Sequence, residues 1–282
     1  MVVFRSGSHA KMPMWIHPTD VERVAREFRG AAPFPHAVID EFLDPGFARE
    51  VAAAYPDFGS ATKLGLEFAT INERRKVQVC DASLFPPPVR QLAALVNSQP
   101  FLDLLSRLTG IPDLLADPAF AGGGMHETAS NGFLDVHVDF NYFEERGWHR
   151  RLNLLVFLNE VWREEWGGQL ELWDAAVKRR YRSLLPLLGR AVIFETSEIS
   201  YHGVPKVTCP EGVVRKSFAA YYYTKEAPAG WDGRRHSTVF RVRPGEAFKG
   251  MVVMPLESAT RGARRLGRRM ARWIARTPDG RT

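Results

Sequence analysis

The sequence predicts a mainly β fold with supporting helices (α+β), in which the helices come first and an antiparallel sandwich or barrel follows. Apolar residues recur at helical spacing before residue 119, and from 119 to 224 they form short runs separated by turn residues. The composition agrees, because 45% of the 282 residues are hydrophobic and 25% are charged. A chain of this length and composition can bury a sizeable core, which excludes wholesale disorder.

The first part of the chain carries the helical signals. Thr19 or Asp20 can cap a short helix, and Asp44 followed by Pro45 starts a second one. After three consecutive prolines at 86–88, two further segments show helical apolar spacing. The expected helices therefore span 19–28, 44–55, 89–96 and 100–108, with a weaker one at 112–115.

The strands are expected mainly in the second part. Two isolated strands at 36–39 and 76–80 come before a series of short apolar runs. The series comprises 124–128, 133–138, 152–158, 169–173, 191–195, 203–207 and 215–223. Such a series is typical of an antiparallel sandwich or barrel rather than of βαβ units.

The chain divides into four parts by composition. We expect an N-terminal extension with a short helix, one domain with a helical support and a β core, an irregular proline-interrupted segment, and a basic tail. Their limits are 1–32, 33–225 (helical support 33–118 and β core 119–225), 226–257 and 258–282.

The net charge of +6 belongs to the tail. Residues 261–276 contain seven arginines and no acidic residue, so the rest of the chain has a net charge of −1. The two cysteines, Cys80 and Cys209, are too few for a disulfide framework. No apolar run approaches the roughly 20 residues needed to cross a bilayer, and no signal peptide is recognisable. We therefore expect a cytoplasmic protein.

The tail has the pattern of a basic amphipathic helix over 258–277, with Ser258 as its cap. Its arginines lie opposite an apolar stripe made of Ala259, Ala263, Leu266, Met270, Trp273 and Ile274. Three roles fit this pattern: peripheral contact with an anionic membrane on the inner face, docking on the protein's own domain, or binding of RNA. The sequence leaves all three open.

Two histidines and one aspartate form a candidate metal site. His137 and Asp139 are two residues apart in an expected strand, so their side chains share one face and can bind one metal. Alone, this pair also fits a surface strand with a polar edge. His202 can return to the same place across a barrel, and two His with one carboxylate form the facial triad typical of non-haem Fe(II). Arg215 follows on an aromatic strand, where a buried guanidinium needs a carboxylate partner such as a dicarboxylate cosubstrate.

The ordered set His137-Val-Asp139, His202 and Arg215 resembles the Fe(II)- and 2-oxoglutarate-dependent dioxygenases, specifically their prolyl 4-hydroxylase-like branch. Residues 151–159 (RLNLLVFLN) and 165–173 (EWGGQLELW) are similar to a pair of core strands in that branch. Residues 35–43 (PHAVIDEFL) are similar to the lead-in to its helical support. The resemblance covers residues 33–225.

The resemblance implies a distorted double-stranded β-helix, or jelly-roll, braced by helices. It implies that His137, Asp139 and His202 ligate Fe(II), and that Arg215 pairs with the distal carboxylate of 2-oxoglutarate. Some relatives use lysine at this point, which makes Lys216 the alternative. The two side chains face opposite ways on a strand, and Arg215 is favoured because small residues share its face.

Two further residues are candidates for the cosubstrate site. His126 lies where the branch often has a polar residue near 2-oxoglutarate, with a structural histidine as the alternative. Asn153 is expected to face inwards and touch the cosubstrate, and the alternative is a core amide satisfied by the backbone. His149 and His236 lie in polar surroundings and are expected to be solvated.

The resemblance implies an enzyme that hydroxylates an unactivated C–H bond with O2 and releases succinate and CO2; ascorbate is a further cofactor that it allows. Asp139 stands where related halogenases have a small residue, so hydroxylation is expected. The substrate would be a prolyl or other peptide side chain, or a small or glycan-type metabolite. The alternatives are a catalytically silent jelly-roll that binds a partner through its tail, and a cupin-like metal enzyme without 2-oxoglutarate, which leaves Arg215 unexplained.

Overall fold

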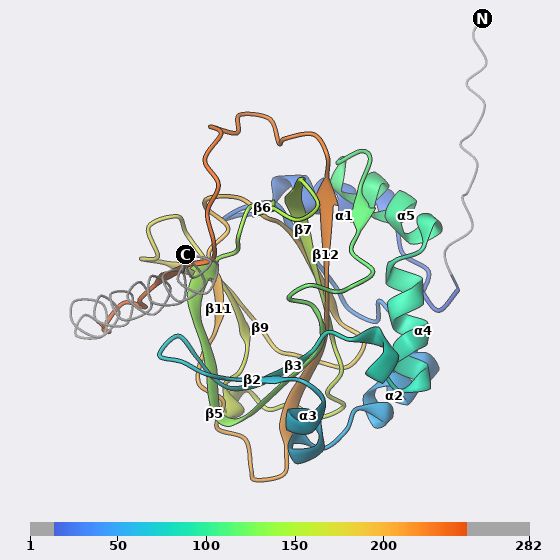
Figure 1. Ribbon diagram of the computed structural model, residues 1–282, viewed down its shortest axis with the longest axis vertical. Coiled ribbons are helices and arrows are strands. Elements are labelled where there is room, and N and C mark those ends of the chain that lie inside the picture. The colour runs from blue at the N-terminus through green and yellow to red at the C-terminus, as the bar shows by residue number, and fades with distance from the viewer. Residues whose placement is uncertain (1–13, 247–282) are drawn as a thin grey trace, which may run out of the picture.

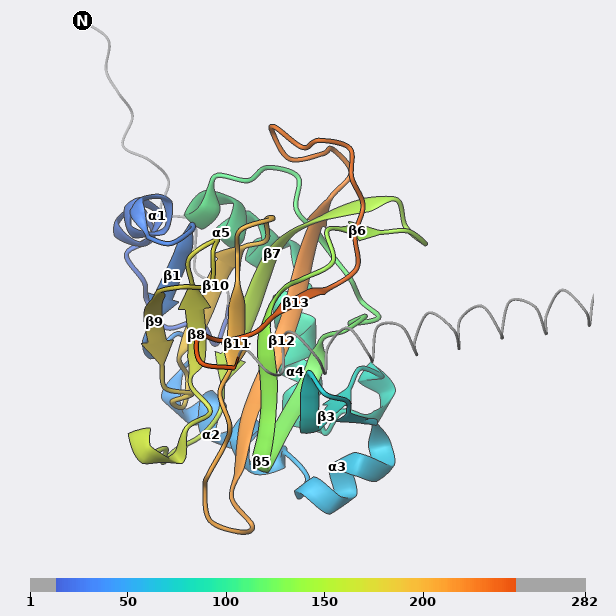
Figure 2. The same ribbon diagram turned by 90° about the vertical axis from the view of Figure 1, so that its left-hand side faces the viewer.

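The computed structural model describes residues 14–246, in which thirteen strands form one curled antiparallel sheet of the jelly-roll type (Figure 1). The main path through the sheet runs β1-β10-β7-β12-β5-β11-β8-β9. The curl gives two walls: β1, β10, β7 and β12 form one, while β11, β8 and β9 form the other with the end of β5 (Figures 1 and 2). The predicted mainly β architecture with helices ahead of it is therefore confirmed.

Five α-helices precede the core strands. Aspartate side chains cap three of them, because Asp20, Asp44 and Asp57 accept hydrogen bonds from backbone N–H groups in the first turns. The helices are α1 (Val21–Gly30), α2 (Pro45–Ala54), α3 (Phe58–Leu64), α4 (Pro87–Val96) and α5 (Gln99–Thr109), and two 3-10 turns span Ala82–Leu84 and Glu164–Trp166.

The thirteen strands follow one another along the chain from His36 to Arg241. The first six are β1 (His36–Ile39), β2 (Leu66–Ala69), β3 (Glu73–Val79), β4 (Leu115–Ala116), β5 (Gly124–Val138) and β6 (Tyr142–Phe143). The others are β7 (Trp148–Phe157), β8 (Leu170–Trp173), β9 (Arg180–Leu184), β10 (Ala191–Glu195), β11 (His202–Val204), β12 (Val214–Thr224) and β13 (Val239–Arg241).

Helices α1, α2, α4 and α5 pack on the outer face of the first wall (Figure 1). Leu154 of β7 and Tyr222 of β12 face these helices in the main apolar cluster, and the Tyr222 hydroxyl donates to the carbonyl of Val96 at the end of α4 (3.0 Å). Because strand side chains alternate, the neighbours of these residues face the interior of the curl. The helices thus fix one wall and leave its inner face for a site.

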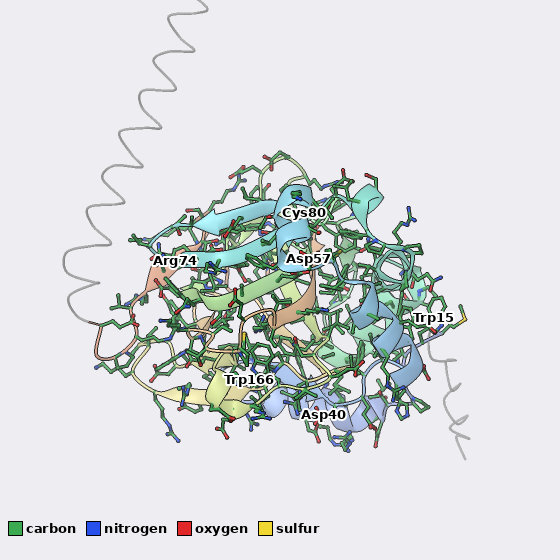
Figure 3. The ribbon with its side chains drawn as sticks, turned by 90° about the horizontal axis from the view of Figure 1, so that it is seen from below. Trp15, Asp40, Asp57, Arg74, Cys80 and Trp166 are labelled. Atoms are coloured by element: carbon green, nitrogen blue, oxygen red, sulfur yellow. The ribbon has the colours of Figure 1, made fainter. Side chains whose placement is uncertain are left out.

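The β2–β3 hairpin covers a different side of the molecule. In Figure 3 Arg74 of β3 and Cys80, just after it, lie on the side opposite Trp166. β3 pairs with β5 from Glu73 to Val79, so the hairpin extends the sheet beside the interior of the curl. Cys80 and Cys209 are both free thiols.

Several predicted boundaries were wrong. The runs 124–128 and 133–138 are one strand, β5, which passes through Asn131 with a left-handed backbone (φ 66°). Residues 112–115 are not helical, and β4 begins at Leu115. The segment 226–257, predicted to be irregular, contains β13. The tail at 258–282 lies outside the described residues, and the four predicted parts of the chain remain predictions. Within residues 14–246, none of the helices combines the length and the apolar character needed to cross a membrane.

Candidate active site

His137, Asp139 and His202 come together as the sequence predicts. His137 lies near the end of β5 and His202 begins β11, and the two residues are paired across the antiparallel ladder. The Nε2 atoms of His137 and His202 each lie 3.6 Å from one oxygen of Asp139. One ligand atom from each of the three residues lies within 4.8 Å of the others. The three side chains therefore converge on one point.

Backbone carbonyls orient both imidazoles. The Nδ1 atom of His137 lies 2.8 Å from the carbonyl oxygen of Asp135, and that of His202 lies 3.0 Å from that of Ser200. A carbonyl accepts a proton at Nδ1, which leaves the lone pair on Nε2 free for a metal. Burial, with a contribution from His137, lowers the pKa of His202 to about 3, so this ring is neutral at pH 7. Two imidazoles with free Nε2 lone pairs and a carboxylate fit Fe(II).

Arg150 and Asn153 hold the carboxylate of Asp139. The Nη2 atom of Arg150 lies 3.2 Å from Oδ2 of Asp139, and the Asn153 amide donates to the same oxygen at 2.7 Å. Arg150 also donates twice to Oδ1 of Asn153 (3.0 and 2.8 Å). Burial would raise the pKa of Asp139, but the adjacent guanidinium of Arg150 outweighs it and holds that pKa well below its usual value. The carboxylate is thus kept ionised and fixed in place.

Arg150 points into the cavity because of a β-bulge in β7, which the sequence pattern does not reveal. On β7 Leu152 pairs with Tyr222, but Arg150 pairs with Tyr223, so Arg151 is an extra residue in the ladder. Strict alternation from Asn153 would direct Arg151 inwards and Arg150 towards the helices. The bulge reverses this, and Arg150, which is 3% exposed, lies against the ring of Tyr221 inside the curl.

The triad opens into a cavity of about 180 Å³ between the two walls. Its lining combines the metal-site residues with polar side chains of β3, β5 and β12. Among them are His126, Thr128, Lys76, Gln78, Arg215 and Ser217.

Arg215 is a buried cation in the lining of the cavity. It is 4% exposed, donates from Nε to the carbonyl of Gly168 at 2.6 Å and lies over the ring of Phe157. Among residues 14–246, no carboxylate lies within ion-pair distance of Arg215. Burial lowers the pKa of Arg215 to about 10. Lys216 points to the other face of β12, where its Nζ donates to the carbonyl of Ala52. Of the two candidates, only Arg215 lines the cavity.

His126 lies beside Arg215 in the same wall of the cavity. His126 pairs with Ser217 across the β5–β12 ladder, and Thr128 pairs with Arg215. The Nε2 atom of His126 is buried and has no hydrogen-bond partner among the described residues. Burial, with Lys76 and Arg215, lowers the pKa of His126 well below its usual value, so the ring is neutral. Within the described part of the chain, one wall thus carries a ring nitrogen without a hydrogen-bond partner and a guanidinium without a carboxylate partner, which fits an anionic, oxygen-rich ligand.

Of two further predictions, the inward direction of Asn153 is confirmed and the solvation of His149 is not. Asn153 faces inwards as predicted, and its described contacts are with Asp139, Arg150 and Thr196, while its contact with the cosubstrate stays a prediction. His149 was predicted to be solvated, which is wrong: it lies in β7, is 7% exposed and packs edge-on against Trp231.

A second, more open pocket of about 520 Å³ adjoins the cavity. The two share Gly122, Phe140 and Thr238 in their linings. The second pocket is lined by aromatic rings of β6 and by charged side chains, including Tyr142, Phe143, Glu144, Glu145, Arg235 and His236. The interior cavity therefore lies next to an aromatic groove at the surface.

Comparison with known sequences gives one family. Residues 123–223, which contain the triad, Arg215 and His126, match the 2OG-Fe(II) oxygenase superfamily. A curated relative, prolyl 3-hydroxylase OGFOD1 from Mus musculus, is 32% identical over 78 residues. These residues make up 26% of this chain and only 14% of the mouse protein.

Comparison with solved structures agrees on the fold. A prolyl-4-hydroxylase from Pseudomonas putida is 18% identical, with a TM-score of 0.51, over 71% of this chain and 98% of that one. A prolyl hydroxylase from Trichoplax adhaerens, in complex with a hypoxia inducible factor oxygen degradation domain peptide fragment, is 16% identical with a TM-score of 0.54. That match covers 73% of this chain and 89% of the other. At these identities the likeness is one of fold.

Proposed function

We propose that this protein is an Fe(II)- and 2-oxoglutarate-dependent hydroxylase, because residues 123–223 belong to the 2OG-Fe(II) oxygenase superfamily. One oxygen atom of O2 would enter an unactivated C–H bond of the substrate, and the other would enter the succinate formed when 2-oxoglutarate loses CO2. Hydroxylation is favoured over halogenation because Asp139 occupies the carboxylate position of the triad.

Fe(II) and 2-oxoglutarate are the cofactors of this superfamily, and the His-Asp-His triad fits the metal. When bound, they supply the oxidising power for C–H cleavage. The residues of this chain bind and orient them: His137, Asp139 and His202 hold the metal, and Arg215 receives the distal carboxylate. The guanidinium of Arg215 lies in the same cavity as the triad and has no carboxylate partner within residues 14–246, and this observation carries the proposal. It favours an oxygenase over a cupin-like enzyme without 2-oxoglutarate.

Anaerobic titration of the metal-free protein with Fe(II) and 2-oxoglutarate tests this function. We expect the weak visible charge-transfer band of the chelated cosubstrate in the wild type and none in His202→Ala. No band in the wild type, or a full band in His202→Ala, contradicts the assignment. A band without succinate release on admission of O2, both alone and with the proline-containing peptides described below, would favour the catalytically silent binding module. Repeating the assay with ascorbate tests whether ascorbate prolongs turnover.

The proposed substrate is a prolyl or other peptide side chain, with a small or glycan-type metabolite as the alternative. The aromatic groove beside the cavity supports a peptide, because it extends the binding surface well beyond a single side chain. The prolyl hydroxylases among the similar proteins point the same way. Proline-containing peptides should stimulate succinate formation, whereas matched peptides with alanine in place of proline should not. Equal stimulation by both sets would remove the prolyl assignment.

We also propose that residues 258–277 place the protein at the inner face of an anionic membrane in the cytoplasm. The support is the amphipathic pattern of arginines and apolar residues in the sequence. Full-length protein should sediment with vesicles containing anionic lipid, and a chain ending at Leu256 should not. If both sediment equally, the membrane role fails. Binding of the full-length chain to RNA but not to vesicles would favour the third role of the tail.

A further inference from the structure

The segment that follows the β core crosses the strands that carry the metal ligands. We call residues 239–243 the strap. β13 lies beside β5 (Figure 2) and pairs with it along Val136–Val138, on the edge of β5 opposite β11. Phe240 is the partner of His137 in this pairing. The strap lies beyond the residues matched to the superfamily, which end at residue 223.

The side chain of Arg243, in the strap, spans three strands that are neighbours in the sheet: β5, β11 and β8. Its Nε donates to Glu171 of β8 (2.8 Å), its Nη2 donates to the carbonyl of Leu134 of β5 (3.2 Å), and its Nη1 lies 3.5 Å from the carboxylate of Asp135. Between β5 and β8 the guanidinium passes over Gly203 of β11. A Cβ at Gly203 would lie only 3.0 Å from Nη2 of Arg243, so the glycine leaves room for this crossing.

The rest of the strap touches both histidine-bearing strands. Nε of Arg241 donates to the hydroxyl of Tyr201 (2.9 Å), which is the residue before His202. The ring of Phe240 packs against the imidazole of His137, with ring centroids 5.4 Å apart. The contacts of this one segment therefore reach the surroundings of both nitrogen ligands.

The ladder between these two strands is interrupted at this place. His202 pairs with His137 but Val204 pairs with Leu134, so β5 contains an extra residue between its two pairing points. The regular hydrogen bonds that would fix β11 against β5 are locally absent at a bulge. Arg243 binds β5 on the far side of this bulge from His137 and passes over β11 beside His202.

We infer that Arg243 is a positioning residue for the metal site, because it holds β11 against β5 across the bulge and so sets the separation of the His137 and His202 nitrogens. The inference rests on the iron triad of the proposed function. Arg180 offers a matched comparison. It pairs with the other oxygen of Glu171 at 2.8 Å from the exposed strand β9, with its side chain half exposed.

Titration of the metal-free protein with Co(II), followed by the absorption of the bound ion, tests the inference alongside thermal unfolding without metal. For Arg243→Met we expect the apparent Kd for Co(II) to rise about tenfold or more, as for other residues that support metal ligands. Arg243→Lys keeps a charge for Glu171 but cannot reach both strands, so its Kd should rise severalfold with an unchanged melting temperature. Arg180→Ala should stay within about twofold of the wild type.

Wild-type affinity in both folded Arg243 variants overturns the inference. If Arg243→Met does not fold, the result for Arg243→Lys decides alone. An equal loss in Arg180→Ala would mean that neutralising Glu171 is what matters, which also overturns it. His202→Ala serves as the reference. Wild-type Co(II) binding in that variant would mean that Co(II) does not bind at the triad, so that the proposed metal site fails rather than the role of the strap.

Discussion

On β12, Arg215 and Lys216 are adjacent cations with opposite surroundings. Arg215 faces the cavity, and Lys216 faces the helices, where it is the direct cross-strand partner of Glu127. Replacing Arg215 with alanine should weaken 2-oxoglutarate binding about 10- to 100-fold, because hydrogen bonds to a charged group contribute about 1.5–3 kcal/mol. Lys216→Ala should leave that Kd within about twofold but lower the melting temperature.

Anaerobic calorimetric titration of 2-oxoglutarate into both variants measures this difference. Lys216→Ala is the matched control, since it removes a neighbouring positive charge of the same strand. Weakened binding in Lys216→Ala with normal binding in Arg215→Ala would move the cosubstrate role to Lys216.

Glu127 is a buried acid on the helix-facing side of β5. It is 1% exposed, and neither carboxylate oxygen has a hydrogen-bond partner among residues 14–246. Burial raises its pKa from 4.5 to about 7, although Lys216 acts in the opposite direction. The folded state therefore binds this proton more tightly than the unfolded state, and its stabilising contribution is lost as the pH rises from about 4.5 through 7.

Thermal unfolding between pH 5 and pH 8 tests this linkage. The melting temperature of the wild type should fall relative to that of Glu127→Gln as the pH rises, because the glutamine does not titrate. Parallel pH profiles for the two proteins would show that Glu127 does not titrate in this range.

Short local patterns were sufficient to find the principal site residues. The spacing of His137 and Asp139 on one strand, with His202 and Arg215 in order, placed four side chains around one cavity. Arg150 could not be found in this way, because its inward direction depends on the extra residue Arg151 in β7. A bulge reverses which side chains of a strand face inwards, and the pattern of apolar residues in the sequence does not reveal it.

At the scale of elements, Gly124 decides how β5 begins. Its backbone is left-handed (φ 84°), and a Cβ there would lie 2.2 Å from the carbonyl oxygen of Val79 in β3. Gly124→Ala should therefore destabilise the protein by more than about 3 kcal/mol, since both backbone strain and a clash oppose it. Gly110, which ends α5, has φ 78° but open space around it, so Gly110→Ala should cost only about 1 kcal/mol.

Urea unfolding of the two alanine variants compares these costs directly. Similar free energies of unfolding for both variants would show that the contact with Val79 does not contribute.

Helices that begin at a capping residue were the most predictable elements. The side chains of Asp20 and Asp44 cap α1 and α2 as the sequence indicates. Elements defined by their partners were harder to predict. β13 is short and half exposed, and it is a strand because β5 offers an edge to it. The predicted break between 128 and 133 was wrong because β5 continues on both sides of Asn131, although the backbone of this residue is left-handed.

For the whole molecule, the site joins segments that are far apart in the chain. Ligands and cavity residues come from β3, β5, β7, β11 and β12, on both walls of the curl. Metal and 2-oxoglutarate should therefore stabilise the entire fold. At concentrations about 100-fold above Kd, each ligand adds about 2.7 kcal/mol, which corresponds to a rise in melting temperature of about 5–10 °C.

Anaerobic thermal scans with Mn(II) and 2-oxoglutarate measure this shift. His202→Ala should show almost none of it. A rise in His202→Ala equal to that of the wild type would mean that the stabilising site lies elsewhere.

Composition and periodicity predicted an antiparallel sandwich or barrel, and the resemblance of the motifs was needed to specify a jelly-roll. The reason is physical. The order of strands in the sheet, with β5 between β12 and β11, depends on contacts between residues some 65 to 90 positions apart, as the pairings of His137 with His202 and of Thr128 with Arg215 illustrate. Periodicity along the chain reports which face of a strand is buried, but not which strand lies beside it.

The pairing of the strap with β5 also has a consequence for the order of events during synthesis. Translation completes β5 at Val138. The earlier strand β3 can already pair with its outer edge as far as Leu134, but the stretch Val136–Val138 gains a partner only when the chain has reached Val239, about 100 residues later. At 5–20 residues per second this interval lasts on the order of 5–20 seconds, during which an exposed strand edge can pair with other chains. Nascent chains released before the strap is made would carry this open edge, so premature termination late in the message would yield aggregation-prone products.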